Sequence, residues 1–310
     1  MGLEHPRRDL PEPRSRGPGE AAARAPVLRQ PEGALRWIES NLRSRSGLRL
    51  LRRSWLPDHP ERAILLVHGY AEHSGRYQEM ACWLARRGCA VHAYDQRGHG
   101  RSEGLRCHAE RFDDFLDDLG IVLDALRSEH PALPITLVGH SMGGLITLAF
   151  LATRKPRISS AITSGAALSL GVVSPVRVAL ARAARRVLPR LSIGSGIDPA
   201  GLSRDPDVVR RYLADPLIVR TMTTSLGAEL LSAAPRTASL AGQVSVPLLV
   251  LHGGADPICS VDGSRAFYAG LRAPGSALRV YPDLRHEIFN EPEREAIWQD
   301  LLSWLQEPRQ

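Results

Sequence analysis

The sequence predicts an α/β fold, with a mostly parallel central sheet, helices on its faces and an inserted helical segment. Short apolar segments alternate with helical ones, which is typical of βαβ units. The apolar segments are nearly continuous in hydrophobicity, as expected for strands covered on both faces. Residues 166–242 interrupt the alternation, and a connection of that length exceeds an ordinary crossover. These observations predict one α/β core that carries an insertion.

The elements are expected in a regular order along the chain. Residues 1–30 are rich in Pro, Arg, Glu and Gly and predict a disordered leader, with a short docking arm as the alternative. Strands are expected at 48–55, 63–67, 89–95, 135–138, 158–163, 248–251 and 278–281, the first two pairing at one edge. Helices are expected at 76–87, ended by Gly88, and at 112–129. The core is therefore assigned to 31–165 and 243–310. The helical cap is assigned to 166–242, where no strand is expected.

One glycine-rich turn points to nucleophilic chemistry. The segment GHSMG places Ser141 between Gly139 and Gly143, directly after an expected strand and before a helix rich in Leu, Ile and Ala. In a G-x-S-x-G turn of this kind the serine hydroxyl stands at the carboxyl edge of the sheet. Side chains at the two glycine positions would collide with neighbouring backbone. Ser141 is therefore the candidate nucleophile, the alternative being a serine in an ordinary tight turn.

A serine nucleophile requires a base and an acid that orients the base. Asp256 follows the expected strand 248–251, and His286 follows the expected strand 278–281. The carboxyl ends of parallel strands meet at one edge, so both side chains are expected beside Ser141. His252, near the end of a strand, is interpreted as structural.

Other nearby polar residues have simpler explanations. Asp262 and Asp283 fit helix-start or turn positions. His99 lies in DQRGHGRSEG and is interpreted as packing that loop. This segment does not match G-x-G-x-x-G, the motif of dinucleotide-binding sites, so we do not expect such a site here.

Acyl transfer also needs two N–H groups for the oxyanion. Met142, the residue after the serine, is expected to supply one. The loop after the strand 63–67 begins His68-Gly69-Tyr70, and the Tyr70 N–H is the second candidate. The alternative is that His68-Gly69 forms only a turn.

Composition and charge indicate which binding partners and which cellular compartment suit this protein. The net charge is +7, but the basic residues are scattered arginines with few aromatics, which argues against nucleic acid and leaves an anionic lipid surface as the better partner. The four cysteines, Cys82, Cys89, Cys107 and Cys259, have no zinc or redox spacing, which favours a reducing compartment. No secretory signal or membrane-length apolar run is evident. We therefore expect a cytoplasmic protein without metal or cofactor.

Together these motifs resemble the monoacylglycerol lipase family of serine α/β-hydrolases, also described as lysophospholipase-like or S33-type. The resemblance covers about residues 35–305 and rests on HGYAEHSGRY, YDQRGHGRSEG, GHSMGG, LSRDPDVVRRYLADPLIVR and LHGGADPICS. It implies an α/β-hydrolase fold with an inserted cap. It places the catalytic triad at Ser141, Asp256 and His286 and the oxyanion amides at Tyr70 and Met142, in agreement with the residue-based assignment.

The resemblance also implies a polar pocket for a glycerol head group at Glu72, Arg76, His140 and Tyr212, with a purely structural Glu72–Arg76 ion pair as the alternative. The family often has a small residue where this chain has Tyr70, so the tyrosine bears on acyl-chain preference. Cys259 matches a family cysteine position and is interpreted as near the site without a catalytic role.

The implied activity is hydrolysis of monoacylglycerols, or of similar lipid monoesters, to fatty acid and glycerol. The alternatives are a lysophospholipase, a short-chain carboxylesterase or an acyltransferase of the same fold, or a non-catalytic binding protein on that scaffold. In the segment 174–190, apolar and arginine side chains lie on opposite faces of an expected helix. That helix would give the cap peripheral contact with an anionic membrane, or else pack on the core with its basic face solvated.

Overall fold

The computed structural model describes residues 35–169 and 183–307. The expected leader at 1–30 and most of the expected helix at 174–190 lie outside the described residues. None of the described helices is long and apolar enough to cross a membrane.

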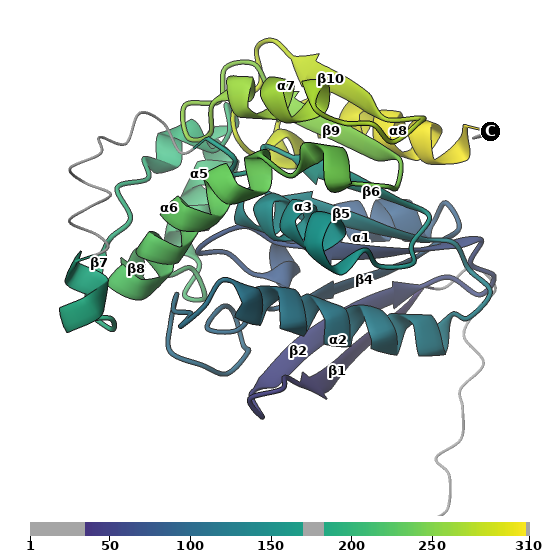
Figure 1. The fold of residues 1–310 in the computed structure, drawn as a ribbon. Coiled ribbons are helices and arrows are strands. Elements are labelled where there is room, and N and C mark those ends of the chain that lie inside the picture. The colour runs from purple at the N-terminus through teal and green to yellow at the C-terminus, as the bar shows by residue number, and fades with distance from the viewer. Residues whose placement is uncertain (1–34, 170–182, 308–310) are drawn as a thin grey trace, which may run out of the picture. The chain divides into compact units, whose positions relative to one another are not determined.

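An eight-stranded sheet forms the core, in the order β1-β2-β4-β3-β5-β6-β9-β10 (Figure 1). Its strands are β1 (Arg36–Arg43), β2 (Arg49–Leu56), β3 (Arg62–Val67), β4 (Cys89–Tyr94), β5 (Ile135–His140), β6 (Ser160–Ser164), β9 (Leu248–Gly253) and β10 (Ala277–Tyr281). From β4 to β10 all neighbours pair in parallel, whereas β1 pairs antiparallel with β2, and β2 antiparallel with β4. The mostly parallel sheet predicted from the sequence is present.

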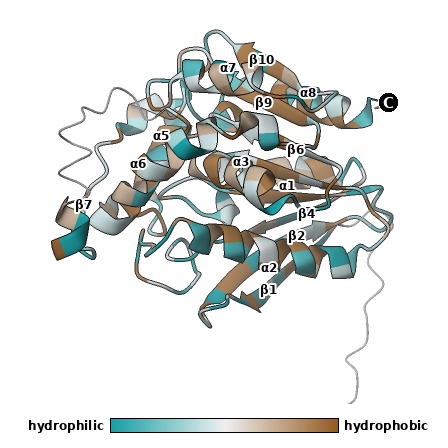
Figure 2. Ribbon diagram, in the orientation of Figure 1, coloured by the Kyte–Doolittle hydropathy of each residue, from teal (hydrophilic) through white to brown (hydrophobic). Residues whose placement is uncertain are grey.

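Helices cover both faces of this sheet. The helices α1 (Gln78–Ala85) and α8 (Arg294–Gln306) pack with one apolar cluster, and α2 (Asp113–Glu129), α3 (Met142–Arg154) and α7 (Val261–Ala269) pack with the other. Strands β3 to β6 and β9 are buried almost throughout, and Figure 2 shows hydrophobic residues along the labelled strands β4 and β9. Burial on both faces explains why these strands read as continuous apolar runs.

In helix α2, the apolar side chains that recur at helical spacing are those that pack in the core. Phe115, Leu119, Val122 and Leu126 recur at helical spacing, and all four side chains are buried. Asp113 and Asp114 stand in the first turn, where carboxylates interact favourably with the helix dipole, and Arg127 stands in the last. The helix begins and ends within a residue of its expected limits.

One expectation about the N-terminal strands was wrong, and one strand was missed. The segments 48–55 and 63–67 do not pair, because β4 lies between β2 and β3. Strand β1 was not predicted at all. It is a largely exposed edge strand of mixed polarity, so it lacks the apolar signal of the buried strands. The expected helix 76–87 divides into η1 (Ser74–Tyr77) and α1, and Gly88 follows with a φ of +83°.

The chain between β6 and β9 contributes a separate group of short elements. They are β7 (Ser192–Gly194), η2 (Pro199–Gly201), α5 (Pro206–Ala214), β8 (Thr221–Thr223), α6 (Thr224–Ala238) and η3 (Ala241–Gln243). Helix α5 begins where Asp205 accepts a hydrogen bond from the Asp207 N–H and Pro206 occupies the first turn. The expectation of no strand here was wrong, because β7 and β8 form a two-stranded antiparallel sheet of three residues each. Strands so short carry no detectable period.

Candidate active site

The turn between β5 and α3 presents Ser141. Its backbone has φ +52° and ψ −117°, a conformation that a residue with a side chain rarely adopts. Its N–H donates to Ser164 O (2.9 Å) and its carbonyl accepts from the Ala167 N–H (3.1 Å), so β6 and the chain after it hold the turn. The strained residue is therefore fixed at the carboxyl edge of the sheet, as the sequence predicts.

Two glycines allow this turn to form. A Cβ added at Gly139 would lie 2.4 Å from Thr147 Oγ1 and 2.5 Å from Gly143 O. A Cβ added at Gly143 would lie 2.1 Å from Val67 O and 2.4 Å from His68 O. The expected collision with neighbouring backbone is thus confirmed, and the close contact brings the loop after β3 against the start of α3.

Replacing Gly143 with alanine is expected to lower the free energy of unfolding by about 3 kcal/mol, since backbone must move to admit the methyl group. Gly120→Ala is the matched control within a helix, because its added Cβ meets only Phe150 at an ordinary 3.7 Å. The control should gain about 0.5–1 kcal/mol from lower chain entropy in the unfolded state. Urea denaturation measures both, and a Gly143→Ala variant as stable as the parent would contradict the steric argument.

Asp256 and His286 are brought together. His286 Nδ1 lies 2.7 Å from Asp256 Oδ2, and both side chains are almost fully buried. Asp256 Oδ1 accepts from the backbone N–H groups of Ile258 (2.8 Å) and Cys259 (3.0 Å). Because a carboxylate only accepts, the His286 proton sits on Nδ1, and Nε2 keeps a free lone pair.

His252 is closer to this pair than the sequence suggests. Its Nε2 lies 2.9 Å from Cys259 O and 3.2 Å from Asp256 Oδ2, and its Nδ1 lies 2.7 Å from Ser264 Oγ. Burial alone would raise the pKa of Asp256, but hydrogen bonds from His252 and His286 hold that pKa below its ordinary value. The only sequence signal for this contact is the four-residue spacing from His252 to Asp256.

Ser141 lies next to the imidazole system. The ring of the preceding residue, His140, lies 4.8 Å from the His286 ring between centroids. The Ser141 hydroxyl contacts the Cys259 thiol, whose pKa is raised by burial. Within the described residues no hydrogen bond joins Ser141 to His286. Such contacts often tighten only when substrate binds.

Both candidate oxyanion amides lie at this point. Met142 is the first residue of α3, so its N–H has no partner within the helix. The Tyr70 N–H also donates to no acceptor in the part of the chain that the structure describes. Gly69 allows the loop after β3 to approach Ser141 closely, because an added Cβ there would lie only 3.2 Å from Ser141 Cβ.

The four residues of the implied glycerol pocket form one buried polar cluster. Arg76 Nη1 donates to Glu72 Oε2 (2.8 Å), and its guanidinium lies 5.2 Å from the centre of the Tyr212 ring. Glu287, which the sequence reasoning missed although it directly follows His286, accepts from both terminal nitrogens of Arg76 (2.6 and 2.7 Å). Burial would raise the pKa of Glu72, but the Arg76 charge holds it below its ordinary value.

His140 has a defined role within that cluster. Its Nδ1 lies 3.1 Å from Ser164 O, which can only accept, so Nδ1 carries the proton and Nε2 is an acceptor. Burial lowers the pKa of His140 to about 4, with His286 contributing. His140 therefore stays neutral at physiological pH.

A cavity of about 1160 Å³, larger than most small-ligand pockets, opens at Ser141. Tyr70, Ser141, Met142 and Cys259 line it from the core. Ala184, Leu191, Ile193, Met222 and Leu230 line it from the segment between β6 and β9. Glu72, Arg76, His140 and Tyr212 are not in its wall. Ser141 thus lines a mostly apolar cavity, and His140 of the buried polar cluster directly precedes it in the chain.

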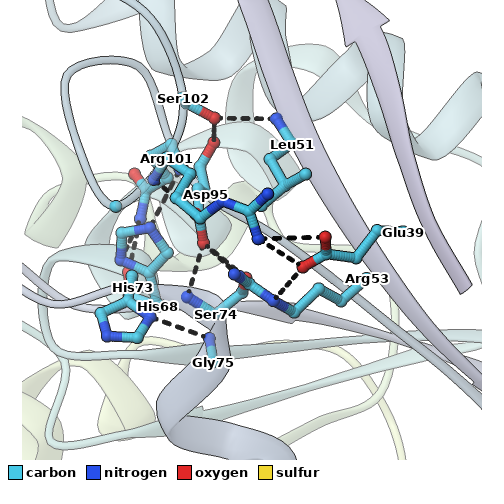
Figure 3. A network of polar contacts seen from close by, with 12 residues as sticks. Glu39, Leu51, Arg53, His68, His73, Ser74, Gly75, Asp95, Arg101 and Ser102 are labelled. Carbon is cyan, nitrogen blue, oxygen red and sulfur yellow. Dashed lines mark hydrogen bonds and ion pairs between the residues drawn. The ribbon is translucent and has the colours of Figure 1, made fainter. Parts of the chain in front are cut away.

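A separate network fixes the loop that carries Tyr70, Glu72 and Arg76 (Figure 3). Asp95, directly after β4, accepts from Arg53 Nη1 and the Ser74 N–H at 2.9 Å and from the Arg101 N–H at 2.8 Å. The carboxylate is fully buried, and these donors satisfy its oxygen atoms in the absence of solvent. His99 lies in the loop after β4, together with Asp95 and Arg101. Its Nδ1 donates to Arg97 O (2.9 Å), which agrees with its interpretation as a packing residue.

Metal-ligating side chains converge at one place in the described residues, away from Ser141. Atoms of His92, Glu129 and His130 lie within 4.8 Å of one another. Arg52 Nη2 lies 2.7 Å from Glu129, and Arg52 Nη1 is buried there without a hydrogen-bond partner. A guanidinium at that position opposes a cation, so we assign no metal to this cluster.

Comparison with known proteins agrees with this geometry. The sequence model of the serine aminopeptidase S33 family matches residues 58–293. A monoacylglycerol lipase of Mycolicibacterium smegmatis is 37% identical over 262 residues, covering 84% of this chain and 93% of the relative. Human monoglyceride lipase is 33% identical over 265 residues, covering 84% and 87%. The crystal structure of Paleococcus ferrophilus monoacylglycerol lipase has a TM-score of 0.75 and 34% identity, covering 83% and 98%.

Fold and site together define a serine hydrolase with the α/β-hydrolase fold. More specifically, the chain belongs to the serine aminopeptidase S33 family and is similar along most of its length to monoacylglycerol lipases. The fold class and the family resemblance predicted from the sequence are confirmed.

Proposed function

We propose that this protein hydrolyses monoacylglycerols to fatty acid and glycerol through an acyl-enzyme on Ser141. One observation carries the proposal: Ser141 lines a large, mostly apolar cavity and directly follows His140, a member of a buried polar cluster that is not part of the cavity wall. An ester of a fatty acid with glycerol has the same division, with an apolar chain on one side of the carbonyl and a diol on the other. The named activity of the relatives supports this substrate class.

In the proposed mechanism Ser141 Oγ attacks the ester carbonyl while His286 Nε2 accepts the hydroxyl proton. The Asp256 carboxylate orients the imidazole through Nδ1 and stabilises its cation. The C–O bond to glycerol then breaks, and the alcohol leaves with the proton from His286. Water, deprotonated by His286, attacks the acyl-enzyme, and the fatty acid leaves as Ser141 regains its proton.

The Tyr70 and Met142 N–H groups are proposed to bind the carbonyl oxygen as it gains charge in both steps. Each has no partner among the described residues, so neither must break a hydrogen bond to do so.

The polar cluster is proposed to recognise the glycerol hydroxyls. His140 Nε2 and the Tyr212 hydroxyl make no hydrogen bond within the described chain, and both residues belong to the polar cluster. His140 Nε2 can only accept, so it is suited to bind a substrate O–H. Arg76 binds both Glu72 and Glu287, which suits these three side chains to hold the pocket in shape. A site of this kind discriminates against substrates without hydroxyls, because its buried polar groups would be left unpaired.

We propose that the segment 166–242 is the cap, since its described residues supply much of the cavity wall. Val187 and Leu188 are among its exposed apolar side chains, with Arg186 and Arg190 exposed nearby, which supports peripheral contact with an anionic lipid surface. All four cysteines are free thiols, which supports a cytoplasmic location.

A fluorophosphonate probe followed by a substrate panel tests the proposal. The probe should label Ser141, and mass spectrometry of the peptide identifies the labelled residue. A monoacylglycerol should show a kcat/KM at least about tenfold above that of a lysophospholipid with the same acyl chain. Preference for the lysophospholipid would instead indicate a lysophospholipase, and failure to label folded protein would indicate a binding protein.

A further inference from the structure

The loop around the peptide group between Gly69 and Tyr70 is held by buried hydrogen bonds, but one of its amides is left unpaired within the described chain. The Gly69 N–H donates to Glu72 Oε1 (2.6 Å), and the Gly69 carbonyl lies 2.7 Å from His68 Nδ1. The Tyr70 N–H, which belongs to the same peptide group as the Gly69 carbonyl, donates to nothing in the described residues. A buried loop that leaves one amide unpaired keeps that donor available for something else.

The surrounding hydrogen bonds determine the tautomer of His68. The Gln96 backbone N–H donates to His68 Nε2 (2.9 Å), so Nε2 must be the acceptor. The proton therefore sits on Nδ1 and is donated to Gly69 O. The Gln96 side-chain nitrogen also lies 3.3 Å from Nδ1, but it is a donor whose hydrogen goes to His68 O. His68 thus bridges two loops as a neutral ring.

The geometry of the peptide bond determines where the Tyr70 N–H points once the Gly69 carbonyl is held. None of the described peptide bonds is cis, and in a planar trans peptide the C=O and N–H point in opposite directions. We propose that His68 is a positioning residue: by holding the Gly69 carbonyl, its Nδ1–H turns the Tyr70 N–H toward the oxyanion beside Ser141. This inference rests on the proposed function, in which Tyr70 is an oxyanion donor.

The setting of this loop agrees with a peptide that is held in place. Ala71, the next residue, has a φ of +67°, which a residue with a Cβ adopts only under constraint. The His99 ring packs against both His68 (5.4 Å) and Tyr70 (6.3 Å) between centroids. Burial lowers the pKa of His68, against the opposing effect of Glu72 and Asp95, so the neutral ring persists at physiological pH.

Two substitutions at His68 separate positioning from simple packing. His68→Ala should lower kcat about 100-fold with KM changed less than about threefold, because an oxyanion donor acts mainly in the transition state. In His68→Asn the side-chain amide nitrogen occupies the place of Nδ1 and can donate to Gly69 O, so kcat should recover to within about fivefold of the parent. Equal losses in both variants, or a parental kcat in folded His68→Ala, would overturn the proposal.

The matched control is His92→Ala. His92 is equally buried and hydrogen-bonded, to Ser54 and His130, but lies away from the site. It should lose thermal stability as His68→Ala does while keeping the parental kcat. A kcat loss in this control as large as that of His68→Ala would mean that the effect comes from a weakened core, and would count against positioning.

A measurement on the unmodified protein covers the case in which the His68 variants do not fold. Nitrogen-15 NMR of the histidine rings should show His68 as the neutral Nδ1–H tautomer, and an Nε2–H tautomer or an imidazolium would overturn the inference. Failure of the proposed function is distinguishable, because it would appear as activity in a variant without the Ser141 hydroxyl, whatever the result at His68.

Discussion

Replacing Ser141 with alanine is expected to lower kcat for monoacylglycerol hydrolysis about a million-fold, the loss typical of removing a nucleophile from a triad. The alanine variant should fold normally, since the strained turn is held by backbone hydrogen bonds from Ser141 N and to its carbonyl. Turnover by purified enzyme, with fatty acid release as the readout, measures the effect.

The control for this experiment is Ser128→Ala. Ser128 is an exposed serine near the end of α2 whose hydroxyl, among the described residues, bonds only to Asp124 O. It should retain the parental kcat. A Ser141→Ala variant with more than about 1% of the parental rate would show that another group attacks the ester.

Replacing Asp256 with asparagine is expected to lower kcat about ten-thousand-fold. Asp256 Oδ1 accepts two backbone N–H groups, so the asparagine oxygen must take that place. The amide nitrogen then occupies the Oδ2 position, where His286 and His252 both present donors. His286 would have to move its proton from Nδ1 to Nε2, and Nε2 could then no longer accept the serine proton.

Asp262→Asn serves as the control, because Asp262 is exposed in the first turn of α7 and, within the described residues, pairs only with Arg265 among side chains.

The Asp256 variant should also lose stability at neutral pH. The folded-state pKa of Asp256 is depressed, so its stabilisation is present above the ordinary carboxyl pKa and fades as the pH falls below that value. A loss of kcat below about tenfold in Asp256→Asn would contradict the orienting role.

Much of the site could be predicted because strand ends and a turn motif are local signals. Ser141, Asp256 and His286 each follow a short apolar strand, and the parallel sheet brings those strand ends to one edge. The glycines around Ser141 carry a steric requirement that can be recognised in the sequence alone.

The rest depended on contacts between segments far apart in the chain. Glu287 and Arg76 are separated by 211 residues, and nothing in their spacing predicts that one guanidinium lies between two buried carboxylates. The pairing of 48–55 with 63–67 was mispredicted because the apolar runs of β3 and β4 look alike, and nothing in either shows which one lies beside β2. Strand β1 was missed because its exposure removes the apolar signal.

The origin of the residues that line the cavity affects which mutations can change the substrate range of this enzyme. The groups assigned to bond breaking lie on loops of the core, whereas Ala184, Leu191, Ile193, Met222 and Leu230 come from the segment between β6 and β9. In the proposed function, bond breaking therefore depends on loops of the core, whereas much of the wall around the acyl chain comes from the inserted segment. A mutation at one of those five positions is expected to change the space for the acyl chain while leaving the triad in place, so the substrate range can change without a change in the chemistry.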